Sequence, residues 1–208
     1  REPEQSGPRR VEVRQEGQLG ALLHAYKSPD GRHDDAEALD VLGRILASGK
    51  GSRLFRNCTD RGLTTDAYAM NFRLRDPGLF CLLTFLAPDQ THDDVEEAVN
   101  DVIEEVQQNG VTEEEVRRAQ TQIRASEAFD RDGPMKVASQ LNEAIAIGDW
   151  RLYVQYPDRI DAVTPEDVQR VARTYLRPER LTVGSYVPTA PPAWDGAPLA
   201  QAAAGPVQ

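Results

Sequence analysis

The chain has 208 residues, of which 39% are hydrophobic and 28% are charged. These values are those of ordinary globular proteins, and the length suffices for one large domain or two small ones. The formal net charge of −10 argues against a nucleic-acid-binding surface, which needs clustered lysine and arginine. No stretch of the sequence approaches the roughly 18 apolar residues that a membrane-spanning helix needs. We therefore expect a soluble globular protein without a nucleic-acid partner and without a membrane span.

The first quarter of the chain is expected to contain a linker, two strands and a helix. Residues 1–8 are rich in charge, proline and glycine and read as a linker. Residues 9–14 alternate between polar and apolar side chains, and residues 19–26 are mostly apolar, as in strands. Residues 34–47 place their apolar side chains on one stripe of a helix.

Two further strands are expected to form a hairpin. Residues 65–75 have an extended pattern, residues 79–86 are almost continuously apolar, and Asp76-Pro77-Gly78 between them is a strong turn signal. A nearly continuous apolar strand is typical of burial on both faces of a sheet. We therefore predict that truncating Leu83 or Phe85 to alanine costs about 2–5 kcal/mol.

From residue 91 onward the pattern is helical, and three helix starts share one device. Thr91, Thr112 and Thr164 each precede an acidic first turn, and a threonine in this position can cap exposed backbone amides. An acid stands three residues after each threonine. Of the three pairs, Thr112 and Glu115 fit the capping-box pattern. Three more elements are expected, namely helices over 134–147 and 149–155 and a strand over 181–187.

The order of these elements indicates an α+β fold. Strands and helices are segregated along the chain, so we expect a mostly antiparallel sheet with helices packed on one face. No linker divides residues 9–187, which are therefore expected to form one domain. Residues 188–208 turn to proline and alanine and read as a tail, in which Trp194 is the one residue large enough to be an anchor.

The sequence offers no active site of its own. Its three histidines are His24, His33 and His92, and no two of them enclose a glutamate in a His-x-x-Glu-His pattern. His33 and His92 each precede two aspartates at an expected helix start, where acids cap the helix more often than they bind metal. His24 is expected to be a packed or edge residue of a strand. Cys58 and Cys81 lack metal-ligand spacing, and Cys81 is expected to be a buried free thiol.

A phosphate-binding loop is a further interpretation that the sequence does not support. Gly49-Lys50-Gly51-Ser52 follows a helix and not a strand, and Lys50 is not followed directly by serine or threonine. We expect Gly49 and Gly51 to let the chain leave the helix through left-handed backbone conformations.

Four segments, in the same order, resemble the pitrilysin/insulinase family of zinc peptidases. They are Ile45 to Phe55 with Asp60 to Leu63, Gly110 to Ala119, Gly148-Asp149 with Ile160 to Val168, and Arg173 to Pro178 with Leu181 to Val183. Together they cover about residues 18–187. Members of this family are built from homologous halves, and only one half carries the His-x-x-Glu-His zinc motif. The resemblance implies a non-catalytic half with the two-layer fold of a metalloprotease half.

The resemblance also implies what the chain works with. The fragment itself is expected to hold no cofactor and to catalyse no reaction, while zinc is expected in a sister domain or subunit of a zinc metalloendopeptidase. The two halves would enclose a chamber for a peptide substrate, and the sequence leaves open whether the assembly is an oligomer. The alternatives are a scaffold protein of the same fold, like core subunits of respiratory complexes, and an unrelated α+β binding module. The sequence does not determine the cellular compartment, and a bacterial periplasm is favoured.

Five residues are expected to face a substrate or a partner: Ser52, Arg53, Arg56, Arg61 and Tyr68. They lie in and after the segment that carries the first part of the resemblance. Family members that complete the active site from the non-zinc half often carry an arginine and a tyrosine around the Arg-Gly-Leu turn.

The arginine and tyrosine positions carry other residues in this chain. Aligning Arg61-Gly62-Leu63 with the family turn puts Cys58 at the arginine position and Thr65 at the tyrosine position. Tyr68 is offset by three residues, and Arg56 fills the role only with a shifted alignment. We therefore expect this half to lack the pair that polarises the substrate as well as the zinc.

Overall fold

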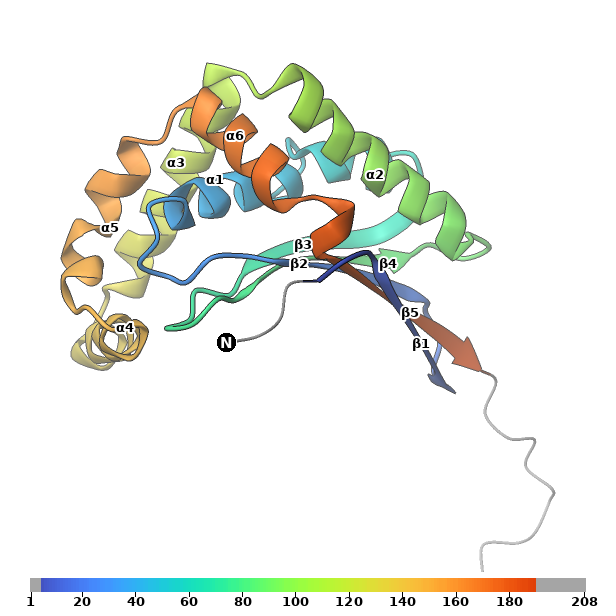
Figure 1. Cartoon of the computed structure of the whole chain (residues 1–208), viewed down its shortest axis with the longest axis horizontal. Coiled ribbons are helices and arrows are strands. Elements are labelled where there is room, and N and C mark those ends of the chain that lie inside the picture. The colour runs from blue at the N-terminus through green and yellow to red at the C-terminus, as the bar shows by residue number, and fades with distance from the viewer. Residues whose placement is uncertain (1–4, 190–208) are drawn as a thin grey trace, which may run out of the picture.

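Five strands form one sheet in the computed structural model, which describes residues 5–189 of the chain (Figure 1). The strands are β1 (Arg9–Glu16), β2 (Ala21–Lys27), β3 (Thr64–Asn71), β4 (Leu79–Leu86) and β5 (Leu181–Thr189). Their spatial order is β1-β5-β2-β4-β3. Only the pair of β1 and β5 is parallel, so the sheet is mostly antiparallel, as predicted.

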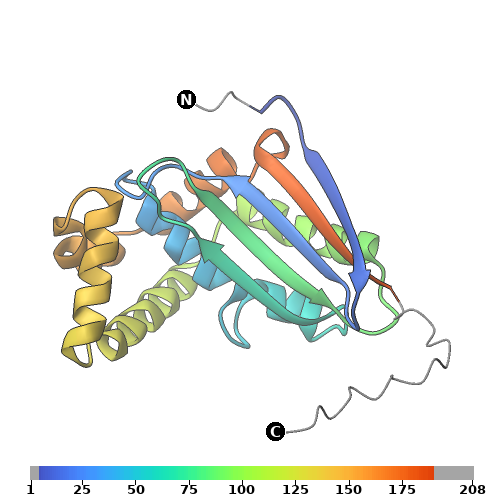
Figure 2. The same cartoon turned by 90° about the horizontal axis from the view of Figure 1, so that it is seen from below.

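The helices lie together on one face of this sheet. They are α1 (Ala36–Ala47), the π-helix η1 (Phe55–Thr59), α2 (His92–Asn109), α3 (Glu113–Asp130), α4 (Pro134–Ile147), α5 (Arg151–Asp161), α6 (Pro165–Tyr175) and the short 3₁₀ helix η2 (Pro178–Arg180). Figure 2 shows the face of the sheet that points away from the helices, where the strands are in full view and no described helix covers them. The predicted α+β class, with helices on one face, is therefore confirmed.

Most expected elements appear close to their predicted bounds, and three differ. The strand expected over 65–75 ends at Asn71, so residues 72–75 belong to the β3–β4 connection. The helix expected over 149–155 begins at Arg151 and continues to Asp161, with Pro157 inside it. The last strand continues to Thr189, so residues 188 and 189 belong to the sheet and not to the tail. The rest of the predicted tail, with Trp194, lies outside the described residues.

The predicted threonine caps are present at all three helix starts. Thr91 Oγ1 accepts a hydrogen bond from the backbone N–H of Asp94 at 3.1 Å. Thr112 and Thr164 each form a complete capping box with the acid three residues later. These local signals define where α2, α3 and α6 begin.

The start of α1 does not use the predicted aspartate cap. Asp35 occupies the cap position, but its side chain makes no capping hydrogen bond. Its carboxylate instead accepts hydrogen bonds from Arg170 Nη1 at 2.6 Å and from the Tyr175 hydroxyl at 2.7 Å. A buried carboxylate gains more from two side-chain donors on α6 than from one backbone amide, so Asp35 links α1 to α6.

Only one of the two glycines after α1 has the predicted conformation. Gly49 has φ +73°, in the left-handed region, and follows the end of the helix. Gly51 is not left-handed, so that part of the prediction is wrong. A Cβ atom at Gly51 would stand 3.3 Å from the Arg118 guanidinium, so close packing is what constrains this position.

The strand β4 is buried on one face and not on both. Phe80, Leu82 and Leu86 face the helices and are almost fully buried. On the open face Leu79 is exposed and Leu83 and Phe85 are half-buried, while Cys81 alone is buried. The prediction of burial on both faces is therefore wrong, because within the described residues helices cover only one side of the sheet.

Candidate functional site

The segment after α1 holds two of the predicted site residues inside the domain. Ser52 and Arg53 lie between η1 and the junction of α2 and α3, with 2% and 7% of their surface exposed. Ser52 Oγ accepts a hydrogen bond from the Phe55 N–H at 3.4 Å, which stabilises the short turn before η1. In this arrangement both side chains serve the packing of their own domain.

Arg53 forms a buried two-pronged ion pair with Glu115, at the start of α3. Its Nε and Nη2 atoms donate to the two carboxylate oxygens at 2.9 Å each, the strong geometry for such a pair. Burial raises the pKa of Glu115, but hydrogen bonds from Arg53 and Thr112 outweigh it and lower the pKa to about 2. Arg53 Nη2 also donates to the Gly110 carbonyl at 3.0 Å, so it joins η1 to the α2–α3 turn.

The other three predicted residues, Arg56, Arg61 and Tyr68, are exposed but do not lie together. Arg56 is on η1, and its Nη2 stands 3.6 Å from Glu115 Oε1 at the edge of the helical layer. Arg61 lies in the turn between η1 and β3. Tyr68 projects from the open face of the sheet, where its ring meets Phe85 edge to face at 6.3 Å. The structure therefore divides the predicted set between the helical layer and the open face.

The positions expected to carry the arginine and tyrosine pair differ in exposure. Cys58 is fully buried in η1, and burial raises the pKa of its thiol to about 11 against a small opposing effect of Arg61. Thr65 is exposed at the start of β3. Neither residue offers a positive charge or a phenol. The missing substrate-polarising pair stays a prediction from the resemblance.

The open face of the sheet carries apolar side chains that the described residues leave partly uncovered. Val11 and Val13 of β1 are 53% and 48% exposed, and Tyr68 of β3 is 47% exposed. Between these edge strands, Leu83 and Phe85 of β4 are half-buried on the same face. Large contiguous apolar surfaces of this kind mark places where a protein meets a partner or a ligand.

A buried polar network, which sequence reasoning missed, lies under the helical layer beside β3. Arg73 Nη2 donates to Glu37 Oε1 at 2.8 Å, and its Nη1 donates to Asp40 Oδ2 at 3.2 Å. The Tyr156 hydroxyl donates to the same Asp40 oxygen at 3.1 Å, and Arg159 pairs with Glu37 at 2.9 Å. Burial raises the pKa of both acids, and Arg73 opposes that shift.

One signal in the sequence pointed to this network. Glu37 and Asp40 stand three residues apart on α1, and Glu37 belongs to the buried side of that helix. A charged residue there needs a partner of opposite sign. The sequence could not name Arg73 and Tyr156 as the partners, because they come from the β3–β4 connection and from α5.

The histidines do not assemble a metal centre. His24 is fully buried on β2, His33 is exposed before α1, and His92 Nε2 lies 2.9 Å from the Tyr186 carbonyl. Within residues 5–189 no group of three or more histidine, cysteine, aspartate or glutamate side chains is placed to hold a metal ion. The residues described here do not fit zinc. In the same range, no helix is both long and apolar enough to span a membrane.

Comparison with known proteins decides the family. The family model described as the peptidase M16 inactive domain matches residues 1–123, more than half of the chain. The chain belongs to this family. The resemblance to the pitrilysin/insulinase zinc peptidases is thereby confirmed, and so is the expectation of a non-catalytic domain.

Three relatives illustrate the match. An uncharacterized zinc protease of Streptomyces coelicolor is 30% identical over 151 residues, which are 71% of this chain and 33% of that protein. The zinc protease PqqE of Helicobacter pylori is 24% identical over 184 residues, 88% of this chain and 41% of that protein. The solved inactive peptidase domain of a Bordetella parapertussis protein is 29% identical, with a TM-score of 0.77, and covers 89% of this chain and 99% of that one.

These shares define what the M16 inactive domain represents. The chain spans less than half the length of the curated relatives that it matches. It spans nearly all of the solved Bordetella domain. The chain therefore corresponds to one domain of proteins whose further sequence lies outside the matched region.

Proposed function

We propose that this M16 inactive domain is the non-catalytic half of a zinc metalloendopeptidase. It would pair with a zinc-bearing sister domain or subunit, and the two would enclose a chamber in which a peptide is bound. The family match and the zinc-protease relatives support this proposal. The chemistry would come from the sister, where a zinc-activated water attacks the peptide bond with a glutamate as general base.

The open face of the sheet is the observation that carries the proposal. An antiparallel sheet normally alternates apolar residues toward the helices with polar residues toward water. Here Leu83 and Phe85 occupy the water side of the interior strand β4, and Val13 and Tyr68 extend the apolar surface to the edge strands. Exposing such side chains to water is unfavourable, so we assign this face to the chamber and to contact with the sister half.

Complementation in trans tests the pairing. The polypeptide that carries His-x-x-Glu-His is assayed on a fluorogenic peptide, alone and with this chain. We expect the catalytic half alone to lose most of its activity and the added chain to restore part of it. Leu83→Glu on the open face should remove the restoration, because a carboxylate there must be desolvated at the contact. Gln108→Glu, at an exposed position of α2, is the matched control and should restore activity as the natural chain does.

Two results would change this account. A catalytic half that is fully active without the chain would leave the domain as a scaffold, the alternative function of this fold. Restoration that also requires a further subunit with an arginine and a tyrosine would confirm that Cys58 and Thr65 leave the substrate-polarising pair to another protein and that the enzyme is an oligomer. A bacterial periplasmic location is part of the proposal, and a compartment-specific reporter fused to the full-length protein tests it.

Metal analysis tests the division of labour directly. We expect the chelator-free chain to bind no stoichiometric zinc and to cleave no peptide, because the sequence lacks His-x-x-Glu-His and residues 5–189 place no three ligand side chains around a metal position. One tightly bound zinc per chain, with cleavage that a chelator stops, would place the catalytic centre in this domain and contradict the proposal.

A further inference from the structure

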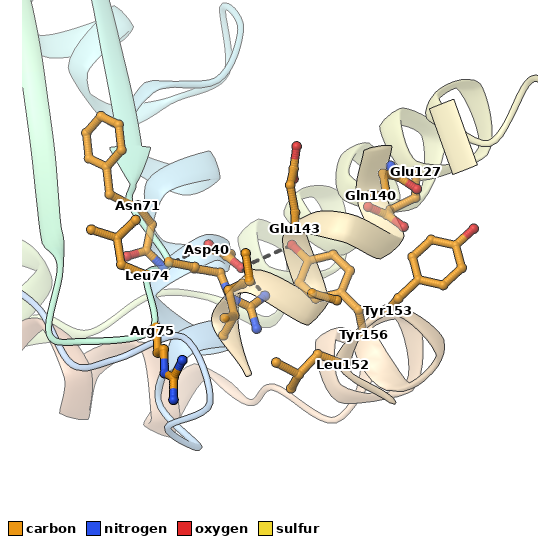
Figure 3. A pocket seen from close by; sticks show the side chains of 15 residues that line it. Asp40, Asn71, Leu74, Arg75, Glu127, Gln140, Glu143, Leu152, Tyr153 and Tyr156 are labelled. Atoms are coloured by element: carbon orange, nitrogen blue, oxygen red, sulfur yellow. Dashed lines mark hydrogen bonds and ion pairs between the residues drawn. The ribbon is translucent and has the colours of Figure 1, made fainter. Parts of the chain in front are cut away.

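A second surface feature lies at the end of the sheet where β3 turns into β4. There a cleft of about 550 Å³ separates the β3–β4 connection from α4 and α5 (Figure 3). We call it the α4 cleft. Phe72 and Leu74 form its sheet-side wall, and Ala144, Ile147 and Leu152 form its helix-side wall. The volume is within the range of sites that take a small ligand or a few side chains of a peptide.

The sheet-side wall of the α4 cleft is apolar and poorly covered, whereas Asp40, Arg73 and Gln140 also line the cleft with polar groups. Phe72 and Leu74 are 45% and 53% exposed, although they stand in a connection of only a few residues between two strands. On the other wall, α4 has Ala144 as its one buried side chain among the residues described. Left-handed glycines flank this helix, with φ +101° at Gly133 and +123° at Gly148. This end of the domain therefore holds apolar surface that its own helices do not cover.

Two unpaired charges of opposite sign stand on opposite walls of the α4 cleft. Arg75 lies on the sheet side and Glu143 on α4, as Figure 3 shows. Within residues 5–189, neither side chain has a hydrogen bond or an ion pair. Arg73, two residues before Arg75, is by contrast engaged by Glu37 and Asp40. The cleft thus combines apolar side chains on both walls with a free cation on one side and a free anion on the other.

We propose that the α4 cleft binds one apolar side chain of a peptide, with a carboxylate of the same peptide at Arg75 and a basic group at Glu143. This proposal rests on the proposed function, since it names a class of substrate sequence for the peptidase. A single extended peptide carries apolar and oppositely charged side chains within a few residues of each other, which matches the cleft. Tyr153, which also lines it, favours an aromatic side chain through ring-to-ring contact.

The expected contributions rank the parts of this site. Burying a large apolar side chain stabilises a complex by about 1.5–3 kcal/mol, which corresponds to roughly ten- to hundredfold in affinity. An exposed ion pair contributes about 0.2–1 kcal/mol, or up to about fivefold. The apolar side chain should therefore provide most of the affinity, and the charges should select among apolar peptides.

Titration of the isotope-labelled chain with a blocked pentapeptide, Asp-Ala-Phe-Ala-Lys, tests the site by nuclear magnetic resonance. We expect amide shifts to concentrate at Phe72, Leu74 and Ala144. A probe with alanine in place of phenylalanine should bind at least about tenfold more weakly. Probes with two aspartates or two lysines should bind about two- to fivefold more weakly than the mixed-charge peptide.

Charge exchange on the protein supplies the matched variants. Arg75→Glu and Glu143→Lys should each weaken the mixed-charge probe about threefold or more, because each creates one like-charge contact. The double variant should restore binding, since the peptide can reverse its direction in the cleft. Both residues are exposed, so these variants are expected to keep the fold, which the unchanged remainder of the spectrum checks.

The outcomes separate this proposal from the proposed function. Absence of cleft shifts at millimolar probe, or equal binding of the phenylalanine and alanine probes, overturns the α4 cleft as a peptide site even if complementation succeeds. Binding that follows the charge exchange while complementation fails would support the cleft and count against the chamber. Shifts confined to the open face of the sheet would also overturn the cleft proposal.

Discussion

The two faces of the sheet differ in a way that the residues of one strand make plain. Leu82 of β4 is fully buried beneath the helices, while its neighbour Leu83 is half-buried on the open face. The two are the same amino acid in adjacent positions. Their difference comes from the layer of helices that covers one face only, as Figures 1 and 2 show. Apolar character along a strand therefore does not by itself report burial in this fold.

The two faces also differ from the usual pattern in which polar residues are exposed and apolar residues are buried. The covered face buries the polar His24 and Thr84 completely, and neither ring nitrogen of His24 has a hydrogen-bond partner within the described residues. The open face meanwhile leaves Phe85 and Val13 partly in contact with water. Burial of an unpaired histidine and exposure of apolar residues both cost free energy, and the proposed contact with a sister half would offset the second of these costs.

The largest expected effect separates the two faces directly. Leu82→Ala should reduce the free energy of unfolding by about 2–5 kcal/mol, because it leaves a cavity beneath the helices. Leu83→Ala, on the open face, should cost about 1 kcal/mol or less, which revises the larger loss predicted for Leu83 and Phe85 from the sequence. Urea unfolding of the two variants measures both values. Equal losses would mean that the open face is covered within the isolated chain.

A second pair of variants compares the interior of the helical layer with its surface. Arg53→Met should cost roughly 3 kcal/mol, because it leaves the Glu115 carboxylate buried without its main partner. Arg56→Met removes a guanidinium 3.6 Å from the same carboxylate, but an exposed one, and should cost about 0.5 kcal/mol or less. Thermal or urea unfolding provides the measurement. A similar loss for both would show that Arg56 shares the pairing equally.

The buried histidine on the covered face predicts a dependence on pH. Burial lowers the pKa of His24 to about 4, with a small opposing effect of Glu96 and a small added effect of Arg10. The unfolded chain binds the proton near the ordinary pKa of 6.5, so stability is lost as the pH falls from 6.5 to about 4. Between pH 7 and pH 5 the loss from this group should be about 2 kcal/mol.

Substitution isolates the contribution of His24. His24→Leu should remove this part of the pH dependence, whereas His33→Gln, at an exposed histidine, should leave it in place. Urea unfolding at pH 7 and pH 5 compares the three proteins. If His24→Leu loses as much stability between pH 7 and pH 5 as the natural chain does, the acid sensitivity belongs to another group.

The smallest effect on stability belongs to the open face. Tyr68→Ala should change the free energy of unfolding by about 0.5 kcal/mol or less, since the ring is exposed and its contacts with Phe85 and Asp66 lie at the surface. If the domain pairs with a catalytic half as proposed, the same substitution should raise the KM for peptide when Tyr68 faces the chamber. If the Tyr68→Ala chain still restores activity and the KM is unchanged, the open face serves contact between the halves and does not bind the peptide.

The elements themselves were largely readable from the sequence. Threonine caps at Thr91, Thr112 and Thr164 and the apolar stripe of α1 are local patterns, and local patterns survive folding when nothing tertiary competes with them. Asp35 shows the limit of this reasoning. Its cap position was predictable, but its carboxylate accepts hydrogen bonds from Arg170 and Tyr175, which lie more than a hundred residues away in the chain.

The sequence by itself determined the α+β class, the order of the elements and the absence of a zinc motif, because these depend on neighbouring residues and on residue types. Only the tertiary structure decided which face of β4 is covered, that Arg53 is internal while Arg56 is exposed, and that Arg73 meets Glu37 and Asp40. Those outcomes depend on which segments, distant in the chain, are brought together, and a list of residues in order does not contain that information.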